Sequence, residues 1–315
     1  MTNEKKTISV IVPAFNEEAV ILIFWERLMQ VMENTGMDYS VVFVNDGSTD
    51  QTRERLRQIQ QQSSRIKVIS FSRNFGHQAA LLAGLERARG DCIISLDGDL
   101  QHPPELIPTL IERWKAGSEL VLTKRVDATD TPPTKMLTSR LFYKLFSGLS
   151  GLELTPGMAD FWLIDRRVAD AMRQLGERSF FLRGMLQWVG FRQETVEYQA
   201  ANRAGGQSKY TWLKMGKLAL DGITSFSIVP LHLATLLGFV FSFLSFLYLL
   251  FAIVTVFITD LNLPGWTSVI GSVLFLGGIQ LICLGILGEY LGKIFLEVKR
   301  RPHYIVESEQ GFTDA

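Results

Sequence analysis

The chain has 315 residues, which is enough for one sizeable α/β domain and a smaller second part. Its 32 Lys and Arg residues balance its 32 Asp and Glu residues, so the net charge gives no reason to expect a nucleic acid as partner. The two cysteines, Cys92 and Cys283, fall in a predicted buried strand and a predicted membrane helix, which argues against a disulfide between them.

From residue 8 onward, short runs rich in Val and Ile alternate with helical patterns. The predicted strands cover residues 8–12, 39–44, 66–71, 92–96 and 120–123. The clearest helical patterns between them cover residues 49–62, 78–88 and 104–114. This alternation predicts an α/β fold with a doubly wound, mostly parallel sheet. Ligands of such sheets bind beyond the carboxyl ends of the strands.

Polar clusters follow the first two predicted strands. Residues 13–18 read Pro-Ala-Phe-Asn-Glu-Glu, and residues 45–50 read Asn-Asp-Gly-Ser-Thr-Asp. Within the second cluster, Asp46 can accept hydrogen bonds from a base or a ribose, whereas Thr49 or Asp50 can cap the helix that follows.

The fourth predicted strand ends in the sharpest cluster, Asp97-Gly98-Asp99-Leu100-Gln101. Hard divalent cations prefer oxygen ligands, and Mg²⁺ usually takes one or two carboxylates together with substrate phosphates. A glycine between the two acids lets the backbone approach a ligand closely. The cluster therefore predicts a cation and phosphate site. Asp99 taken alone also fits a cap for the helix that opens near Pro103.

Two long uncharged runs dominate the last third of the chain. Residues 231–258 would form about 42 Å of helix, which exceeds the ~30 Å hydrocarbon core of a bilayer. A second uncharged run covers residues 268–287. The connector between them has no Lys or Arg, whereas Lys209, Lys293 and Arg300 are among the basic residues that flank the runs. The pattern predicts two membrane helices with both termini cytoplasmic, and a pair of buried core helices is the alternative.

Other segments have patterns typical of the membrane interface. Leucines recur at four-residue steps in residues 135–149, which predicts an amphipathic helix that lies in the interface or packs on the sheet or on a second subunit. Residues 210–225 carry Trp and Lys side chains that suit the headgroup level. Small-residue pairs such as Gly288 and Gly292 favour a homo-oligomer, although ordinary glycine tolerance explains them equally well. The polar residues 1–7 predict no cleavable signal peptide.

Together these clusters resemble a known family. They are joined by Arg-Asn-Phe-Gly at residues 73–76, Leu-Arg-Gly at residues 182–184 and Arg-Ala-Gly-Gly-Gln-Ser-Lys-Tyr at residues 203–210. With these elements, residues 7–300 resemble the inverting glycosyltransferase family two, which has the GT-A fold. Within that family the chain looks like the polyprenyl-phosphate glycosyltransferases, such as bactoprenol glucosyltransferases and dolichol-phosphate mannose synthases.

The expected organisation combines this resemblance with the apolar runs. It comprises a cytoplasmic GT-A domain at residues 1–208 with an amphipathic helix at about 134–149, an interfacial helix at 209–228, two transmembrane helices within 229–298 (about 229–258 and 267–296) and a cytoplasmic tail at 299–315.

The resemblance also implies roles for individual residues. Positions that match the family's nucleotide site are Pro13, Phe15, Glu17, Asp46, Asp97, Gly98 and Asp99. Asp99 and Gln101 match the site of a Mg²⁺ or Mn²⁺ ion. Asp160 aligns with an acid near the reacting sugar, although Ala159 stands where the family has glycine. Together with Asp99 and Arg203, Asp160 forms the expected catalytic set.

The acceptor that the resemblance implies is a lipid phosphate, whose second pKa of about 6 makes it mostly anionic at pH 7. Such an acceptor needs cations rather than a strong base, so Asp160 either takes a proton or only positions sugar hydroxyls. The candidate acceptor-phosphate residues are Arg125, Lys135, Ser139, Arg203 and Lys209. His77 fits a phosphate contact or, more simply, the start of a helix, and His102 fits a place behind the metal site.

The expected reaction is the inverting transfer of a single sugar to undecaprenyl phosphate at the cytoplasmic membrane face, with glucose from UDP-glucose as first choice. The chain has no Gln-x-x-Arg-Trp element of the kind used by processive polysaccharide synthases, which favours a single transfer. The alternatives are mannosyl or aminoarabinosyl transfer to the same lipid class, a membrane-bound nucleotidyltransferase and a non-catalytic anchor.

Overall fold

The structure, a computed structural model, describes residues 6–126, 148, 157–175, 182–199, 223–225, 227–258 and 265–312. The chain divides into two units. The first comprises residues 1–144, 152–209 and 301–315, and the second comprises residues 145–151 and 210–300.

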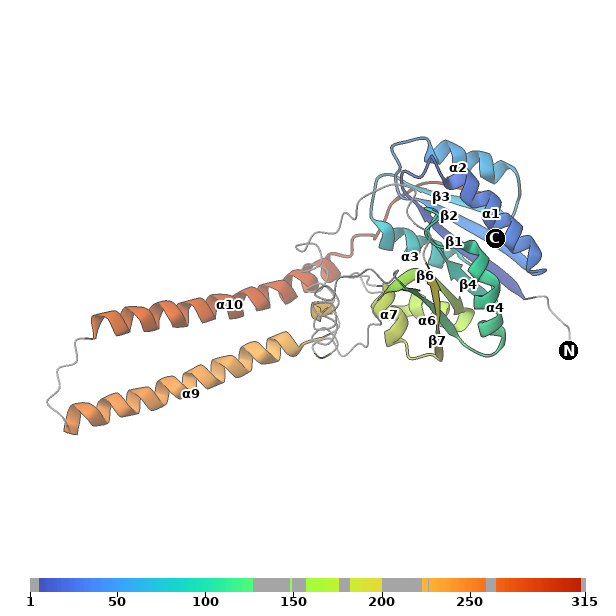
Figure 1. Cartoon of the computed structure of the whole chain (residues 1–315). Helices are drawn as coiled ribbons and strands as arrows, with labels where there is room; N and C mark the ends of the chain where they lie inside the picture. The colour runs from blue at the N-terminus through green and yellow to red at the C-terminus, as the bar shows by residue number, and fades with distance from the viewer. Residues whose placement is uncertain are drawn as a thin grey trace. The chain divides into compact units, whose positions relative to one another are not determined.

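A sheet of eight strands, in the order β7-β5-β6-β4-β1-β2-β3-β8, forms the centre of the first unit (Figure 1). β1 pairs in parallel with β2 and β4, and β2 pairs in parallel with β3. β6 runs antiparallel between β4 and β5, β7 is parallel to β5, and β8 is antiparallel to β3. The strands are β1 (Thr7–Ala14), β2 (Asp38–Asn45), β3 (Ile66–Phe71), β4 (Cys92–Ser95), β5 (Leu120–Val126), β6 (Met158–Asp165), β7 (Gln193–Gln199) and β8 (Val306–Gln310).

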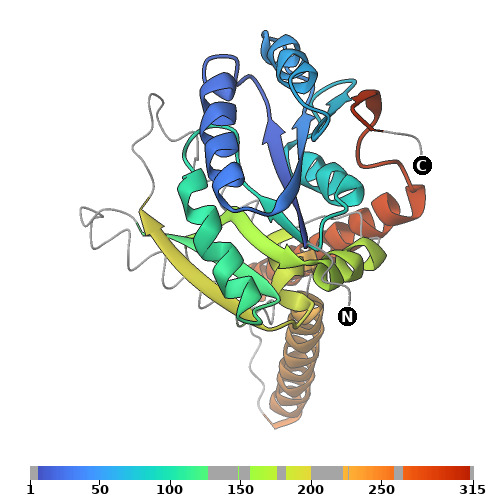
Figure 2. The ribbon, with the colours of Figure 1, turned by 90° about the vertical axis from the view of Figure 1, so that its right-hand side faces the viewer.

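Helices cover both faces of this sheet (Figure 2). Successive side chains of a strand point to opposite faces, so Val41 and Phe43 of β2 join one buried cluster, with α1, α2 and α4, and Val42 and Val44 join another, with α3. Because both faces are covered, the central strands are nearly continuous apolar runs. The helices of this unit are α1 (Ile21–Asn34), α2 (Thr52–Gln61), α3 (His77–Arg87), η1 (Pro104–Leu106), α4 (Ile107–Lys115), α6 (Arg166–Leu175) and α7 (Leu182–Trp188).

The predicted α/β fold is confirmed. All five predicted strands are present, and each of the three predicted helical patterns overlaps a helix. The order of the central strands, β4-β1-β2-β3, puts their carboxyl ends on one edge of the sheet.

The C-terminal segment adds the last strand to this sheet. Tyr304 stacks on Phe71 of β3, with the ring centroids 4.8 Å apart, and β8 follows two residues later. Two ion pairs join β8 to the helices: Arg53 with Glu307 at 3.0 Å and Arg87 with Glu309 at 2.6 Å. Residues 299–315, expected as a separate tail, therefore contain a strand of the first unit.

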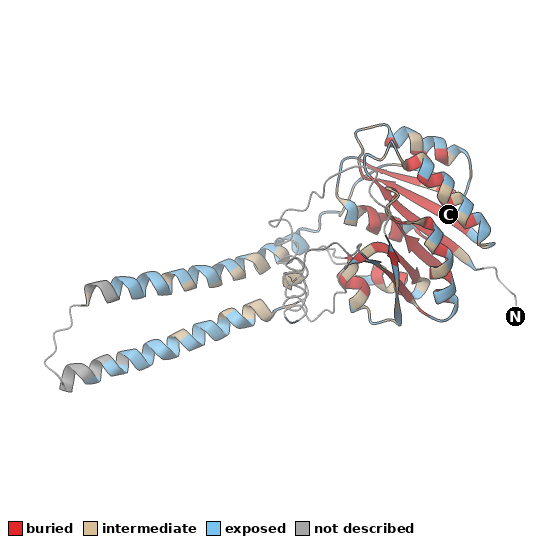
Figure 3. Cartoon of the chain, in the orientation of Figure 1, coloured by how far each residue is buried: buried red, intermediate tan, exposed pale blue. Residues whose placement is uncertain are grey.

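The second unit holds two long helices, α9 (Val229–Ile258) and α10 (Trp266–Lys299). Their segments Val229–Tyr248 and Val269–Lys299 are long and apolar enough to cross a membrane, and their side chains are largely exposed (Figure 3). Exposed apolar side chains over such lengths suit lipid surroundings rather than water. The amphipathic helix predicted at 134–149 lies outside the described residues apart from one position.

Candidate active site

Two adjoining cavities lie where the central strands end. The first has a volume of about 290 Å³ and the second about 240 Å³. The first is lined by all seven predicted nucleotide-site positions: Pro13, Phe15, Glu17, Asp46, Asp97, Gly98 and Asp99. The second is lined by Gln101, Arg125, Asp160 and Arg183, among others, and it shares Asp97 with the first. The structure therefore brings the strand-end acids and two arginines into one region.

The loops that follow β1 and β2 hold each other by hydrogen bonds. The backbone N–H of Asn16 donates to the Ser48 hydroxyl at 3.1 Å, and the N–H of Glu17 donates to the Thr52 hydroxyl at 2.8 Å. Asn16 has a φ of 56°, a left-handed conformation that asparagine tolerates better than most residues. These contacts fix Phe15 and Glu17 at the wall of the first cavity.

Asp46 ties the end of β2 to the loop that follows β3. Its two carboxylate oxygens accept hydrogen bonds from the backbone N–H of Phe75 at 2.6 Å and of Gly76 at 2.9 Å. Burial raises the pKa of Asp46, while these two hydrogen bonds oppose the rise. Gly47 permits this arrangement, because its φ is 64° and a Cβ there would lie 2.2 Å from the carbonyl carbon of Arg73.

Negative charge is concentrated in the first cavity. Burial, followed by the nearby charges of Asp99, Asp97 and Asp50, raises the pKa of Glu17 to about 7. Burial also raises the pKa of Asp97, whose Oδ1 atom is buried without a hydrogen-bond partner among the described residues. The cavity therefore suits a ligand that supplies hydrogen-bond donors or positive charge.

Asp99 and Gln101 meet across a tight turn. The backbone N–H of Gln101 donates to Asp99 Oδ1 at 3.0 Å, and its side-chain amide donates to the other carboxylate oxygen. Leu100 between them has a φ of 63°, which is unusual for a branched residue and lets the two side chains converge. The helix η1 that starts at Pro104 has no side-chain capping bond, so the alternative of Asp99 as its cap is not supported.

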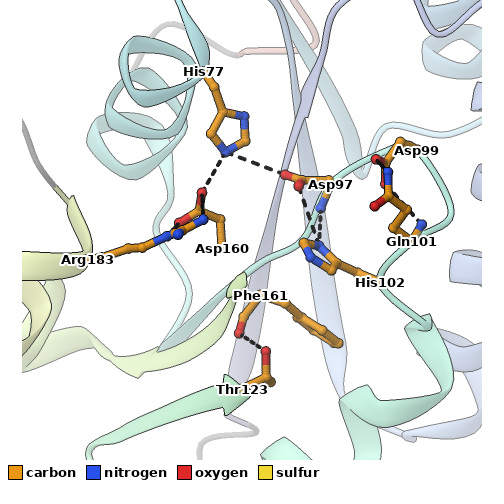
Figure 4. A network of polar contacts seen from close by, with 9 residues as sticks. All are labelled: His77, Asp97, Asp99, Gln101, His102, Thr123, Asp160, Phe161 and Arg183. Carbon is orange, nitrogen blue, oxygen red and sulfur yellow. Dashed lines mark hydrogen bonds and ion pairs between the residues drawn. The ribbon is translucent and has the colours of Figure 1, made fainter. Parts of the chain in front are cut away.

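Asp160 lies at the centre of a charged network (Figure 4). Its carboxylate accepts hydrogen bonds from Arg183 Nε at 2.8 Å and Arg183 Nη2 at 2.9 Å, and His77 Nε2 lies 3.2 Å from Oδ2. His77 Nε2 is also 3.6 Å from Asp97 Oδ1. Burial alone would raise the pKa of Asp160, but the hydrogen bonds and charges of His77 and Arg183 outweigh it and hold that pKa well below its usual range.

His102 contacts Asp97, another member of the same network. The backbone N–H of Asp97 donates to His102 Nδ1 at 3.1 Å, and the buried His102 ring stacks on Phe161 with centroids 5.5 Å apart. His102 therefore fixes the backbone just beyond the end of β4.

Arg125, which lines the second cavity, lies where β5 comes close to the residue that precedes β6. The backbone N–H of Arg125 donates to the Gly157 carbonyl at 2.9 Å, and a Cβ on Gly157 would lie 2.8 Å from the Arg125 carbonyl oxygen. Tyr198 of β7 lines the same cavity, and burial raises the pKa of its hydroxyl to about 12. The second cavity thus combines two guanidinium groups with a neutral phenol.

Comparison with known proteins places the chain in a family. Residues 9–173 match the family described as glycosyl transferase family 2. The chain belongs to glycosyl transferase family 2.

Relatives cover nearly the whole of this family 2 chain. It is 44% identical over 303 residues to an uncharacterised glycosyltransferase, YkcC, of Bacillus subtilis (strain 168), covering 96% of this chain and 94% of the relative. It is 42% identical over 303 residues to a bactoprenol glucosyl transferase of Shigella phage SfV, covering 96% and 99%. Among solved structures, a mycobacterial protein has a similar fold with a TM-score of 0.50 and 20% identity, over 70% of this chain and 73% of that one.

Some site residues of this family 2 glycosyltransferase lie beyond the described residues, and others were not predicted. Four of the expected acceptor-phosphate residues lie outside the described part of the chain: Lys135, Ser139, Arg203 and Lys209. Arg183 and Tyr198 line the second cavity without a predicted role. The signal for Arg183 was the Leu-Arg-Gly element at residues 182–184, which marks the family but does not reveal its partner, Asp160.

Proposed function

We propose that this family 2 glycosyltransferase transfers one glucose from UDP-glucose to undecaprenyl phosphate, with inversion at the anomeric carbon. The observation that carries the proposal is the pair of adjoining cavities, one rich in acids and one with Arg125 and Arg183, that share Asp97. Relatives that are 42% identical to the chain are named bactoprenol glucosyl transferases, which supports the sugar and the lipid class.

The first cavity suits the donor nucleotide. Phe15, with 42% of its surface exposed, offers an apolar ring on which a base can stack. The Asp46 carboxylate retains acceptor capacity after binding two amides, so it can accept from a uracil N–H or a ribose hydroxyl. Asp97 Oδ1 has no hydrogen-bond partner among the described residues, so it suits a hydroxyl of the transferred sugar.

Asp99 and Gln101 fit a divalent cation. Their oxygens are hard ligands, and the acids Glu17 and Asp97 line the same cavity as Asp99, so negative charge surrounds the place that a cation would occupy. With two protein ligands, most coordination positions would go to donor phosphates and water, as is usual for Mg²⁺. When bound, Mg²⁺ or Mn²⁺ would supply positive charge to the leaving UDP.

The second cavity suits the acceptor phosphate. The planar guanidinium groups of Arg125 and Arg183 match phosphate oxygens. The acceptor phosphate, with a second pKa of about 6, is mostly a dianion at pH 7 and is itself the nucleophile. One of its oxygens bonds to the anomeric carbon while the bond from that carbon to the β-phosphate oxygen breaks, and the electron pair leaves with UDP. Attack from the side opposite the diphosphate inverts the configuration.

Asp160 positions groups rather than accepting a proton. A carboxylate whose pKa is held well below its usual range is a weak base, and the acceptor dianion has no proton to give up at the attacking oxygen. The proposed task of Asp160 is to orient Arg183 and a hydroxyl of the sugar.

The helices α9 and α10 would anchor the enzyme in the membrane that holds the lipid acceptor. The basic residues that flank them favour cytoplasmic termini, where UDP-glucose is available. Lys135, Ser139, Arg203 and Lys209 remain proposed phosphate ligands, and a homo-oligomer remains the proposed assembly.

A donor panel tests this proposal. The full chain in detergent micelles is given undecaprenyl phosphate, Mg²⁺ or Mn²⁺ and one labelled donor at a time: UDP-glucose, GDP-mannose or UDP-aminoarabinose. We expect organic-extractable label from UDP-glucose at the highest rate. Faster transfer from another donor would replace glucose in the proposal, and no lipid-linked label from any donor would refute it.

A further inference from the structure

His77, the first residue of α3, lies between two carboxylates that come from different strands. Its Nε2 is 3.2 Å from Asp160 Oδ2 and 3.6 Å from Asp97 Oδ1 (Figure 4). His77 lines the first cavity, Asp160 lines the second, and Asp97 lines both. The imidazole therefore lies where the two cavities adjoin.

Without His77, the described side chains that line the first cavity would carry negative charge only. Four carboxylates line the first cavity, and His77 has the only basic side chain among the described residues that line it. Arg183 donates hydrogen bonds from two nitrogens to the oxygens of Asp160, and it lines the second cavity rather than the first. A cation facing Asp97 and Asp160 together reduces the repulsion between them.

A purely structural role at the start of α3 does not explain this side chain. The residue before it, Gly76, is the N-cap of the helix, and no side-chain capping bond is present there. The N-terminus of a helix carries partial positive charge, which disfavours a cation beside it. Burial also lowers the pKa of His77, yet the hydrogen bond to Asp160 and the charges of Asp97 and Asp160 outweigh both burial and the charge of Arg183 and raise that pKa.

We propose that His77, as a cation, is a positioning residue that holds the carboxylates of Asp97 and Asp160 correctly oriented where the two cavities adjoin. This inference rests on the glucosyl transfer proposed above, in which Asp97 receives a sugar hydroxyl and Asp160 orients Arg183. Loss of the cation lets the two carboxylates repel each other and turn away. The transfer step then slows more than nucleotide binding weakens, because the contacts proposed for Phe15 and Asp46 do not include His77.

Two substitutions separate charge from hydrogen bonding. His77→Gln keeps a donor N–H of similar reach without a charge, and His77→Lys keeps a charge. With UDP-glucose and undecaprenyl phosphate at pH 7, we expect His77→Gln to lower kcat about tenfold or more with little change in KM for UDP-glucose, as for a misplaced reacting group. We expect His77→Lys to recover most of that loss. His303→Gln, a histidine that lines neither cavity, is the control and should match wild type.

A spectroscopic measurement tests the contact without relying on turnover. The chain has 4 histidines, so nitrogen-15 spectra of imidazole-labelled full chain are simple, and the His77 signals are those lost in His77→Gln. We expect both His77 nitrogens to be protonated at pH 7, and we expect Asp160→Asn to shift these signals toward the neutral form.

The outcomes distinguish this inference from the proposed function. A wild-type protein that is inactive with every donor refutes the glucosyl transfer. A His77 signal that is neutral and does not change in Asp160→Asn refutes the contact between His77 and Asp160. An active wild type with His77→Gln at full rate, or with His77→Gln and His77→Lys equally inactive, overturns the role of the charge and leaves the transferase function standing.

Discussion

The guanidinium of Arg183 donates a hydrogen bond to each carboxylate oxygen of Asp160, from Nε to Oδ1 at 2.8 Å and from Nη2 to Oδ2 at 2.9 Å. Asp160 belongs to β6 and Arg183 to α7, so the pair joins a strand to a helix at the wall of the second cavity. Bidentate pairs of this kind are geometrically specific as well as strong. The pair therefore acts as a fixed support for the site.

Arg183→Lys should damage catalysis although it keeps the charge. Lysine presents a point charge and cannot match both oxygens of Asp160, so the carboxylate loses its orientation. We expect kcat/KM for the lipid acceptor to fall by about 10- to 100-fold, the scale of a displaced positioning group. The measurement is steady-state transfer to undecaprenyl phosphate.

A matched control for this substitution is available on the surface. Arg167 contacts Asp165 at 3.1 Å, and its side chain is 69% exposed, away from both cavities. Arg167→Lys should change kcat/KM little. Equal losses of kcat/KM in the two variants would mean that general destabilisation, and not the loss of the two hydrogen bonds to Asp160, lowers the activity.

Glu17→Gln should stabilise the metal-free protein at alkaline pH. Its pKa is raised from 4.5 to about 7 in the folded chain, so the unfolded chain loses this proton first as pH rises. The contribution of the Glu17 carboxyl to the free energy of unfolding is therefore fully present below pH 4.5. It is lost as the pH rises from 4.5 through about 7. Glutamine cannot ionise, so Tm in EDTA should exceed wild type by a few degrees at pH 8 and match it near pH 4.5. A constant difference across this range would contradict the cause assigned here.

Gly47→Ala should disturb the loop that Asp46 holds. A Cβ at this position would lie 2.2 Å from the Arg73 carbonyl carbon, so the backbone must shift, and the φ of 64° adds strain. We expect a loss of about 2–4 kcal/mol in the free energy of unfolding. We also expect a higher KM for UDP-glucose.

Gly36→Ala is the control for Gly47→Ala, because Gly36 also has a φ of 64° but a Cβ there meets nothing within 4 Å. It should cost only the strain of a left-handed alanine, about 1 kcal/mol, and leave KM unchanged. Denaturant unfolding and donor titration measure both. If the two variants behave alike, the close approach to Arg73 has no bearing on the site.

Ending the chain at Ile305 should destabilise the first unit. This truncation removes β8, exposes the edge of β3 and deletes two ion pairs, whereas Glu309→Gln removes one ion pair only. Exposed ion pairs contribute at most about 1 kcal/mol, so most of the effect must come from the strand. We expect a clear fall in Tm for the truncation and little change for Glu309→Gln. An unchanged Tm in the truncated chain would show that β8 adds nothing to stability.

The sequence predicted the parts of the site that local patterns determine. Val- and Ile-rich runs that end in Asp46 or Asp97 mark parallel strands, and the carboxyl ends of adjacent parallel strands meet at one edge. That is why the seven predicted nucleotide-site residues, spread from Pro13 to Asp99, all line one cavity.

Contacts between polar residues that are far apart in the sequence were not predicted. Arg183 and His77 meet Asp160 only through the packing of α7 and α3 around the sheet, and neither residue has a local pattern that announces its partner. The strand β8 has the sequence Val-Glu-Ser-Glu-Gln, which lacks an apolar strand pattern. Its pairing with β3 bridges more than 200 residues, so only the three-dimensional fold reveals it.

The most direct test of the account is transfer of labelled glucose by the full chain and by its Asp99→Asn variant. Both are incubated with UDP-glucose, undecaprenyl phosphate and Mg²⁺, and the organic extract is analysed for labelled lipid and its anomeric configuration. We predict a β-glucosyl lipid from wild type and none above background from Asp99→Asn, with both proteins folded and membrane-inserted. Label that stays in the aqueous phase, retention of the α configuration, or wild-type activity in Asp99→Asn would contradict the account.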